Sequence, residues 1–247
     1  CYFKFRDEQA ARCDRASSTD SPHSTTRTHP STPYTVVLSA KQRKRQPAIA
    51  RTPVKGYVKE IYKVYGEQDK NLIIPVYQRN YDWKIKQCSR LFDDLENLIR
   101  EDRPKHFFGA VVGKADGAWK WIVIDGQQRL TTVSLLMLAL SHCIDRGHIV
   151  CNEDGLAQRI RKSYLVIDDG DDVKFKLKPV KDDDLAYRSL FRDEEYFIES
   201  SNVTANYRYL TKRIMETELT ADQLWDSICK LEVMFLDLED HDDPQRI

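Results

Sequence analysis

The sequence predicts an α+β fold, in which a small mixed sheet packs with helices and a mainly helical extension follows. Two runs rich in aromatic and β-branched residues, 107–113 and 119–124, are typical of paired strands, and the link between them contains Gly117. Apolar residues recur at helical spacing on either side of this hairpin, over 85–99 and 127–144. Further helical patterns dominate the second half of the chain, and together these observations give the fold class.

Residues 1–53 are predicted to be a disordered, basic lead. Between Ser17 and Pro33, thirteen of seventeen residues are Ser, Thr or Pro, a composition that buries too little apolar surface to offset its ordering entropy. Residues 1–55 carry eleven Lys and Arg against four Asp and Glu, although the formal net charge of the chain is zero. Such a lead could touch nucleic acid, but short basic runs in flexible tails are more often solvated.

A core is expected over residues 54–146. Its elements, in order, are a helix over 54–65, a strand over 72–76, an irregular polar and aromatic segment over 75–83, a helix over 85–99, the hairpin over 107–124 and a helix over 127–144. The last helix is apolar nearly all round, which is typical of a helix sandwiched between other elements. We therefore expect its first turn to be held rigidly.

A mainly helical extension, truncated at its end, is expected over residues 147–247. Within 173–178, apolar residues alternate with three lysines, which predicts a half-buried strand. The lysines could meet phosphate, but we favour a solvated edge strand protected by its charge. The other expected elements are helices over 206–215 and 222–230, a strand over 231–238 and the start of a final helix at 242–245.

The cysteines and the apolar runs exclude several classes of protein. None of the six cysteines forms a CxxC pair, so neither a zinc knuckle nor a disulfide framework is indicated. Cys88 and Cys143 lie on the apolar faces of predicted helices, where buried, unreactive thiols are expected. The longest apolar run, 133–140, is too short to span a bilayer, so we expect a cytoplasmic protein without membrane contact.

The most informative motif is IDGQQRLTT at 124–132, where a strand ends and a helix begins. A helix N-terminus offers free amides to an anion, and this one carries a carboxylate, a glycine, two amides, a guanidinium and two hydroxyls. A structural reading stands beside this one, because Asp125 is a good N-cap and Gln128 would complete a capping-box-like pair. Arg129 does not fit that reading, since a guanidinium suits bidentate recognition of phosphate. The motif therefore predicts a phosphate-handling corner.

Three motifs occur in order along the chain: IPVYQRNYDW at 74–83, HFFG at 106–109, and IDGQQRLTT followed by a Leu-rich helix. Together they resemble the N-terminal domain of GmrSD-type modification-dependent (type IV) restriction enzymes, over about residues 54–247. The resemblance implies a ParB/sulfiredoxin-like core over 54–146. It also implies a domain that binds and hydrolyses a nucleoside triphosphate and senses modified or phage DNA, gating a C-terminal nuclease of His-Asn-His type. No His-Asn-His cluster occurs among the six histidines, so we expect the nuclease to be absent from this chain.

The resemblance and the chemistry together suggest roles for the motif residues. Arg129 would grip a phosphate oxygen, with the backbone amides of 126–128 completing an anion nest. Asp125 would hold Mg²⁺ through water or position an attacking water. The expected catalytic residues are Asp125, Arg129 and Arg79, the expected nucleotide-binding residues are Gly126, Gln127, Gln128, Thr131, Gln78 and Tyr77, and the expected metal ligand is Asp125.

Arg79 lies beyond the first predicted strand, and in a ParB-like fold that loop faces the 124–132 motif. Its guanidinium could then reach the same phosphates, with Gln78 and Tyr77 beside it. The alternative is structural: Tyr77 would be buried and Arg79 would form an ion pair with Asp93 or Asp94.

Two further readings concern aromatic and acid–base chemistry. Tyr77, Tyr81 and Trp83 form an aromatic cluster suited to stacking flipped or unusual bases, with core packing as an equal alternative and Trp83 the residue expected to pack. His106 could act as an acid or base near neutral pH, although a packed histidine is the better reading.

Two functions follow as hypotheses. The first is a magnesium-dependent nucleoside triphosphatase, a hydrolase whose state is coupled to DNA sensing in anti-phage defence, with nucleotide and DNA as its partners. The second is a ParB-like module that binds DNA without hydrolysis. A regulatory fragment acting through partner helices is a third reading, supported only by the helical second half. The sequence is also compatible with a homodimer.

Overall fold

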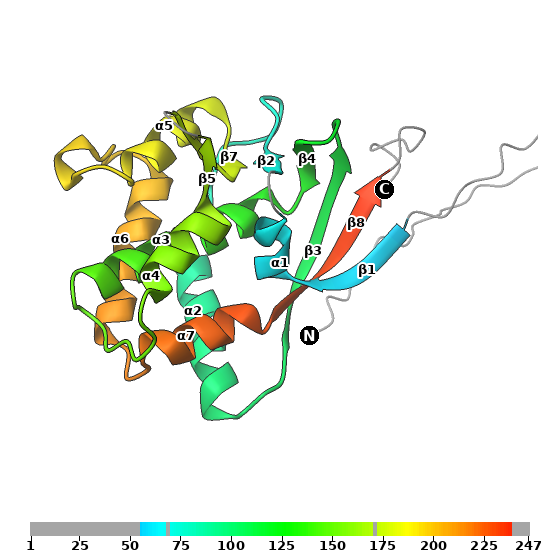
Figure 1. Cartoon of the computed structure of the whole chain (residues 1–247). Helices are drawn as coiled ribbons and strands as arrows, with labels where there is room; N and C mark the ends of the chain where they lie inside the picture. The colour runs from blue at the N-terminus through cyan, green and yellow to red at the C-terminus, as the bar shows by residue number, and fades with distance from the viewer. Residues whose placement is uncertain (1–54, 68–69, 170–171, 239–247) are drawn as a thin grey trace, which may run out of the picture. The chain divides into compact units, whose positions relative to one another are not determined.

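The computed structural model describes residues 55–67, 70–169 and 172–238 (Figure 1). The predictions for the lead over 1–53 and for a helix start at 242–245 lie outside these residues. The described chain contains a six-stranded mixed sheet in the order β1-β8-β3-β4-β2-β7, with helices gathered on one side of it (Figure 1). This confirms the predicted α+β fold class.

The strands of the sheet are β1 (Lys55–Glu60), β2 (Asn71–Ile73), β3 (His106–Ala115), β4 (Lys120–Asp125), β7 (Leu177–Lys178) and β8 (Leu231–Leu238), while β5 (Val166–Asp169) and β6 (Asp172–Phe175) form a separate hairpin. The helices are α1 (Ile61–Gly66), α2 (Ile85–Arg100), α3 (Gln127–Asp145), α4 (Leu156–Ile160), α5 (Lys181–Ser189), α6 (Asn202–Glu216) and α7 (Ala221–Cys229). A π turn, η1 (Arg161–Leu165), follows α4, and a 3₁₀ turn, η2 (Glu194–Tyr196), precedes α6.

The sheet draws its strands from both halves of the chain. β8 lies between β1, with which it is antiparallel, and β3, with which it is parallel. β4 is antiparallel to β3 and parallel to β2, and β2 is parallel to β7. Because β2, β4 and β7 point the same way, their carboxyl ends meet at one edge. The division of the chain near residue 146 stays a prediction.

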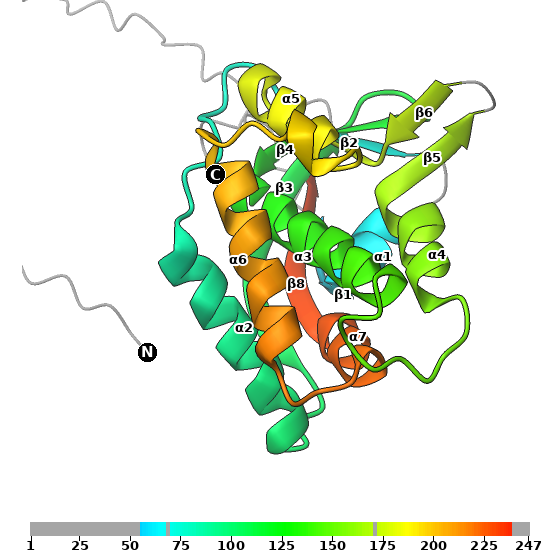
Figure 2. The same ribbon diagram turned by 90° about the vertical axis from the view of Figure 1, so that its left-hand side faces the viewer.

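α3 lies at the centre of the helical layer, between α6 and α4 (Figure 2). Every residue from Leu130 to Ser141 on this helix is buried, as its all-round apolar pattern predicts. Because α3 is packed on all sides, its first turn is held in place. No helix among the described residues is long and apolar enough to cross a membrane.

Most predicted elements occur close to where the sequence indicates them, including the 107–124 hairpin and helices α2, α3, α6 and α7. The helix predicted over 54–65 is wrong in its first half, because Lys55–Glu60 is strand β1 and α1 begins only at Ile61. The apolar spacing fits a helix, but backbone pairing with β8, 170 residues or more away in sequence, overrides it. A local pattern contains no information about that partner.

The strand predicted across 173–178 is divided in two. β6 ends at Phe175 and β7 begins at Leu177, where it joins the main sheet beside β2. Lys176 lies at the division and is only 4% exposed, and its Nζ donates to the carbonyl oxygen of Glu67 at 2.9 Å. The prediction of a solvated strand edge is therefore wrong for Lys176, because this ammonium group finds a partner inside the fold.

Cys88 and Cys143 are buried, as their positions on apolar helix faces predict. Burial raises the pKa of both thiols to about 11. Since the thiolate is the reactive form, both cysteines are unreactive near neutral pH.

Candidate functional site

The three sequence motifs meet at the carboxyl ends of β2 and β4. The loop over residues 74–84, which joins β2 to α2, is fastened to the start of α3 by side-chain amides. Gln78 Nε2 donates to the carbonyl oxygen of Ile124 at 2.9 Å, and Gln127 Nε2 donates to Gln78 Oε1 at 3.2 Å. The expectation that this loop faces residues 125–129, which we call the DGQQR corner, is correct.

Gly126 makes the turn from β4 into α3. Its φ of +90° lies in the left-handed region, and a Cβ there would lie 3.0 Å from the carbonyl oxygen of Ala110 and 3.1 Å from Val111 Cα. Gly126 is itself the N-cap of α3, and no side chain caps the helix. The reading of Asp125 as an N-cap is therefore wrong, and the first-turn amides keep no side-chain partner from a cap.

Gln128 points inward, and both ends of its amide bind the 74–84 loop. Its Oε1 accepts from the backbone N–H groups of Asp82 at 3.0 Å and Trp83 at 3.2 Å, while its Nε2 donates to the carbonyl oxygen of Asn80 at 3.0 Å. The side chain is 5% exposed. It therefore fixes the course of the loop.

Residues that the sequence analysis missed complete this buried side. Asn206 of α6 donates to the Tyr81 hydroxyl at 3.0 Å and to the Trp83 carbonyl at 2.7 Å. Asp183 of α5 accepts from the Tyr81 N–H at 2.6 Å, and burial raises the pKa of this carboxyl. The Tyr81 hydroxyl also lies 2.7 Å from Thr132 Oγ1. We call Gln128, Thr132, Tyr81, Asn206 and Asp183 the inner network.

No local signal in the sequence identifies Asp183 or Asn206, because they reach the 74–84 loop from helices about 100 residues away in sequence. Their roles depend on how α5 and α6 pack, which spacing along one segment does not reveal.

Arg129 points away from the inner network. Its half-buried guanidinium has no hydrogen-bond or ion-pair partner within the described part of the chain. It lies against Gly109 of the HFFG motif, where a Cβ would lie 2.6 Å from Arg129 Nε and 2.9 Å from Cζ. Gly109 has a φ of +110°, so both its backbone and its missing side chain make room for the guanidinium. Gly109 is a third residue that the sequence analysis missed as part of the site.

Asp125 is exposed at the end of β4, where its backbone is paired with Val112. The structure shows no side-chain partner for it among the described residues. Those residues also contain no group of three or more His, Cys, Asp or Glu that could hold a metal ion. One free carboxylate fits Mg²⁺ in the manner of a nucleotide site, where the ion keeps several waters and is held mainly by phosphates.

Arg79 and Tyr77 are on the outside of the 74–84 loop. Arg79 Nη1 lies 2.8 Å from Asp82 Oδ2, and both side chains are at least half exposed. The alternative ion pair with Asp93 or Asp94 is therefore wrong. Tyr77 is 75% exposed, so the alternative in which it is buried is wrong too.

The aromatic residues do not form the predicted stacking cluster. Tyr81 is 4% exposed and belongs to the inner network. Trp83 packs edge-on against Phe108, with ring centroids 6.3 Å apart, as the packing alternative for Trp83 expects. Tyr77 remains the one exposed ring of the three.

His106 begins β3, and its Nε2 lies 3.6 Å from Asp94 Oδ2. Val112, which pairs with Asp125, is six positions further along that strand. A strand rises about 3.3 Å per residue, so His106 lies roughly 20 Å from the end of β4. This partly buried histidine is outside the DGQQR corner.

A small, partly open cavity lies beneath the corner. It holds about 10 Å³, room for about one water molecule, and Gln127, Gln128, Thr131 and Asp183 are among the residues that line it. The side chains of the two glutamines and of Thr131 are therefore buried beneath the corner. The open side of the corner carries Asp125 and Arg129.

A comparison with known protein families gives one match. The model of one family, described as the GmrSD restriction endonuclease N-terminal domain, matches residues 59–247. No curated protein matches the chain. The matched region contains the 74–84 loop, Gly109 and the whole DGQQR corner, and it covers most of the sequence. The chain therefore belongs to the family of GmrSD restriction endonuclease N-terminal domains and is a module of a restriction protein.

Proposed function

We propose that this domain binds a nucleoside triphosphate together with Mg²⁺ at the DGQQR corner and hydrolyses it, and that this step is coupled to sensing of modified or foreign DNA. The observation that carries the proposal is Arg129. A half-buried guanidinium without a protein partner is costly to keep unless an anion uses it, and Gly109 leaves it space. Cleavage of DNA would belong to a separate nuclease domain of His-Asn-His type, and the system would act in the cytoplasm.

Phosphoryl transfer needs mainly positioning and charge neutralisation, and the corner offers both. Arg129 would bind the oxygens of the transferred phosphate bidentately. The first amides of α3, which lack intrahelical partners, would bind a neighbouring oxygen. Arg79 could join them, because an exposed ion pair such as Arg79–Asp82 stabilises by only about 0–1 kcal/mol and is easily exchanged.

Asp125 would hold the magnesium ion, which supplies charge neutralisation on the phosphate oxygens. The carboxylate is exposed beside the first turn of α3, so it can reach the ion through water without disturbing the fold. The side chains of Gln127, Gln128 and Thr131 would act indirectly, by holding the loop and the helix start, while their segment's backbone meets the phosphates.

The test is phosphate release by the full chain with each of the four triphosphates, with and without Mg²⁺. Arg129→Ala and Asp125→Asn should each lower turnover about 100-fold or more, as loss of one transition-state contact does. The matched control is Arg90→Ala, which removes an exposed arginine of α2 and should leave turnover unchanged. Turnover that survives Arg129→Ala and Asp125→Ala together would overturn the proposed site.

A second candidate is a DNA-binding module without hydrolysis, favoured by the exposure of Tyr77 and Arg79 on one loop. An exposed ring beside a guanidinium suits stacking and phosphate contact. Salt-dependent DNA binding that is lost in Tyr77→Ala, without any triphosphate-induced rise in melting temperature, would favour this module. A triphosphate-induced rise that depends on Arg129 would favour the hydrolase.

A further inference from the structure

A groove lies beside the DGQQR corner. Its volume is about 460 Å³, within the range of small-molecule sites. Tyr77 forms one side, residues 114–117 of the β3–β4 hairpin form the other, and Ile122 and Ile124 of β4 lie between them. The 74–84 loop and the strand that leads into α3 therefore build this groove as well as the corner.

The floor of the groove is apolar. Trp121 and Val123 are 3% and 0% exposed and belong to the core. Side chains alternate along a strand, so Ile122 and Ile124 point to the opposite face of the sheet, where both are half-buried. Ile124 directly precedes Asp125, and Ile122 lies three positions before it, roughly 10 Å along the strand. The floor thus runs from the corner towards the hairpin.

The aromatic side of the groove is held in place by the loop. The backbone N–H of Gln78 donates to the carbonyl oxygen of Pro75 at 3.0 Å, which closes a turn that contains Tyr77. The side chain of Gln78 ties this turn to the Ile124 carbonyl oxygen at 2.9 Å. The Tyr77 ring is 75% exposed, so its face is open to a ligand. Such a ring stacks on the face of a nucleotide base.

The hairpin end of the groove carries a carboxylate, that of Asp116. The backbone N–H of Asp116 donates to the Lys120 carbonyl oxygen at 2.9 Å, which fixes the turn. Its side chain is exposed and has no hydrogen bond or ion pair within the described part of the chain. An ionised carboxylate only accepts hydrogen bonds, through two oxygens. Guanine offers it two adjacent donors, N1–H and the N2 amino group, whereas adenine, cytosine and uracil do not.

We propose that this groove, which we call the base groove, holds the base of the nucleoside triphosphate and prefers guanine. The base stacks on Tyr77 above the two isoleucines, and its donor edge meets Asp116. The ribose and the phosphates then lead along β4 to Asp125 and Arg129. This inference rests on the proposed function, because it places the base of the same triphosphate.

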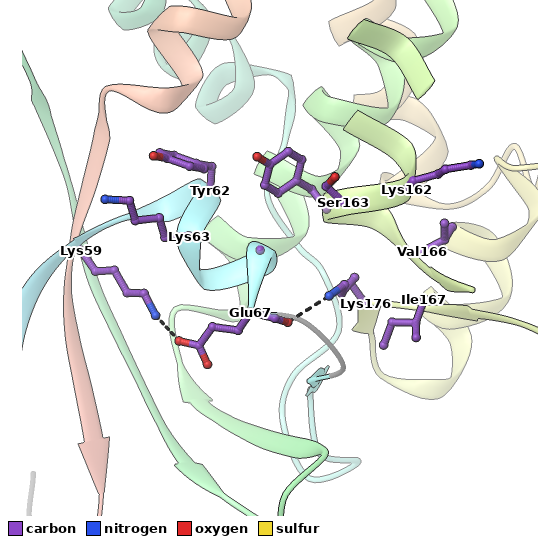
Figure 3. Close-up of a pocket in the computed structure, with 11 residues that line it drawn as sticks. Lys59, Tyr62, Lys63, Glu67, Lys162, Ser163, Val166, Ile167 and Lys176 are labelled. Atoms are coloured by element: carbon purple, nitrogen blue, oxygen red, sulfur yellow. Dashed lines mark hydrogen bonds and ion pairs between the residues drawn. The ribbon is translucent and has the colours of Figure 1, made fainter. Parts of the chain in front are cut away.

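The cleft between α1 and η1 is larger, about 570 Å³, but it is a poorer place for a nucleotide (Figure 3). Three of its four lysines already have partners in the protein. Lys59 pairs with Glu67, Lys63 pairs with Glu60 at 3.0 Å, and Lys176 donates to the Glu67 carbonyl oxygen at 2.9 Å. None of the lining residues of that cleft belongs to the DGQQR corner, whereas the base groove begins next to it.

The test measures binding to the full chain by calorimetry, with Mg²⁺ present. The ligands are the non-hydrolysable β,γ-imido triphosphates of guanosine and adenosine, inorganic tripolyphosphate, and guanosine alone. Tyr77→Ala should weaken binding of both nucleotides about tenfold, as loss of one stacked base does, and leave tripolyphosphate binding unchanged. Asp116→Asn should weaken binding of the guanosine nucleotide about tenfold and of the adenosine nucleotide less than about threefold. The matched control is Tyr196→Ala, at an exposed tyrosine outside the groove, and it should change none of these affinities.

The same titrations separate the base groove from the phosphate site. Equal affinity for the two nucleotides would overturn the guanine preference, and tripolyphosphate binding as tightly as both would overturn the groove while leaving the corner. Arg129→Ala should weaken both nucleotides and tripolyphosphate alike. Guanosine binding that depends on Tyr77, with no binding of tripolyphosphate, would support the groove and contradict the proposed phosphate site. Absence of binding for every ligand would overturn both.

Discussion

The inner network and the open side of the DGQQR corner differ in nearly every physical respect, although they share one turn of α3. Gln128 and Thr132 are buried and have hydrogen-bond partners, whereas Arg129 and Asp125 are accessible and have no protein partner among the described residues. Successive helix residues point about 100° apart, so neighbours in the motif face different surroundings. The motif is thus divided between buried residues that hold the loop and accessible residues that we propose meet a ligand.

The largest expected effect separates activity from stability. Arg129→Ala should lower phosphate release about 100- to 1,000-fold, because one charged contact to the transition state is lost. The free energy of unfolding should not decrease and should rise slightly, because Arg129 has no protein partner to lose and its unpaired charge is costly to keep. Single-turnover phosphate release and urea unfolding of the same preparation measure the two. A large loss of stability would mean that Arg129 belongs with the inner network.

Gln128→Ala should behave in the opposite way. It leaves two N–H groups and one carbonyl of the 74–84 loop without partners, so we expect a loss of roughly 2–4 kcal/mol in the free energy of unfolding. Urea unfolding monitored by circular dichroism gives the value. Gln158→Ala, at an exposed glutamine of α4, is the control and should cost only a few tenths of a kcal/mol. Similar losses in both variants would contradict the role of the inner network.

His142 extends the comparison to the far end of α3. Burial, with the nearby charges of Arg146 and Arg161, lowers the pKa of its imidazole to about 4, and its Nδ1 lies 2.7 Å from the Tyr207 hydroxyl. Because the pKa of His142 is lower in the folded state than in the unfolded state, protonation of its imidazole destabilises the fold. The free energy of unfolding therefore has its full value above about pH 6.5 and decreases as the pH falls towards 4, by up to about 3 kcal/mol.

His142→Gln should remove that part of the acid sensitivity. Urea unfolding at pH 7.5, 5.5 and 4.5 should show a smaller decrease in the variant than in the wild type. His148→Gln replaces an exposed histidine and should leave the pH dependence as it is. A wild-type decrease between pH 6.5 and 4 that His142→Gln retains in full would refute the assignment.

The last prediction tests the contact between the HFFG motif and the corner. Gly109→Ala places a Cβ against Arg129 at a positive φ, so it should cost about 1–2 kcal/mol and displace the guanidinium. Gly117→Ala is a close control, because its φ is +73° but nothing lies within 4 Å of the added Cβ. Both variants therefore carry the backbone strain of an alanine at positive φ, but only Gly109→Ala should lower phosphate release. Equal activity in the two variants would show that Gly109 serves the backbone alone.

The sequence predicted the elements whose interactions are between residues close together along the chain, and it failed where the partners are far apart. The corner, α2, α3 and the β3–β4 hairpin follow from spacing and turn residues within about 40 positions, and all were predicted. β1 was predicted as helix, because its conformation depends on pairing with β8. Asp183, Asn206 and Gly109 were missed for the same reason, since each matters only through a residue that packing brings to it.

The place of β8 in the sheet also governs how the chain is made. This strand lies between β1 and β3, yet Leu231 follows Ala115 by 116 residues. At translation rates of about 5–20 residues per second, β8 is synthesised several seconds or longer after β1 and β3, the strands that it joins. During synthesis on the ribosome both therefore expose unpaired edges, which are templates for aggregation. Chaperone dependence of the nascent chain should end once β8 has emerged from the exit tunnel.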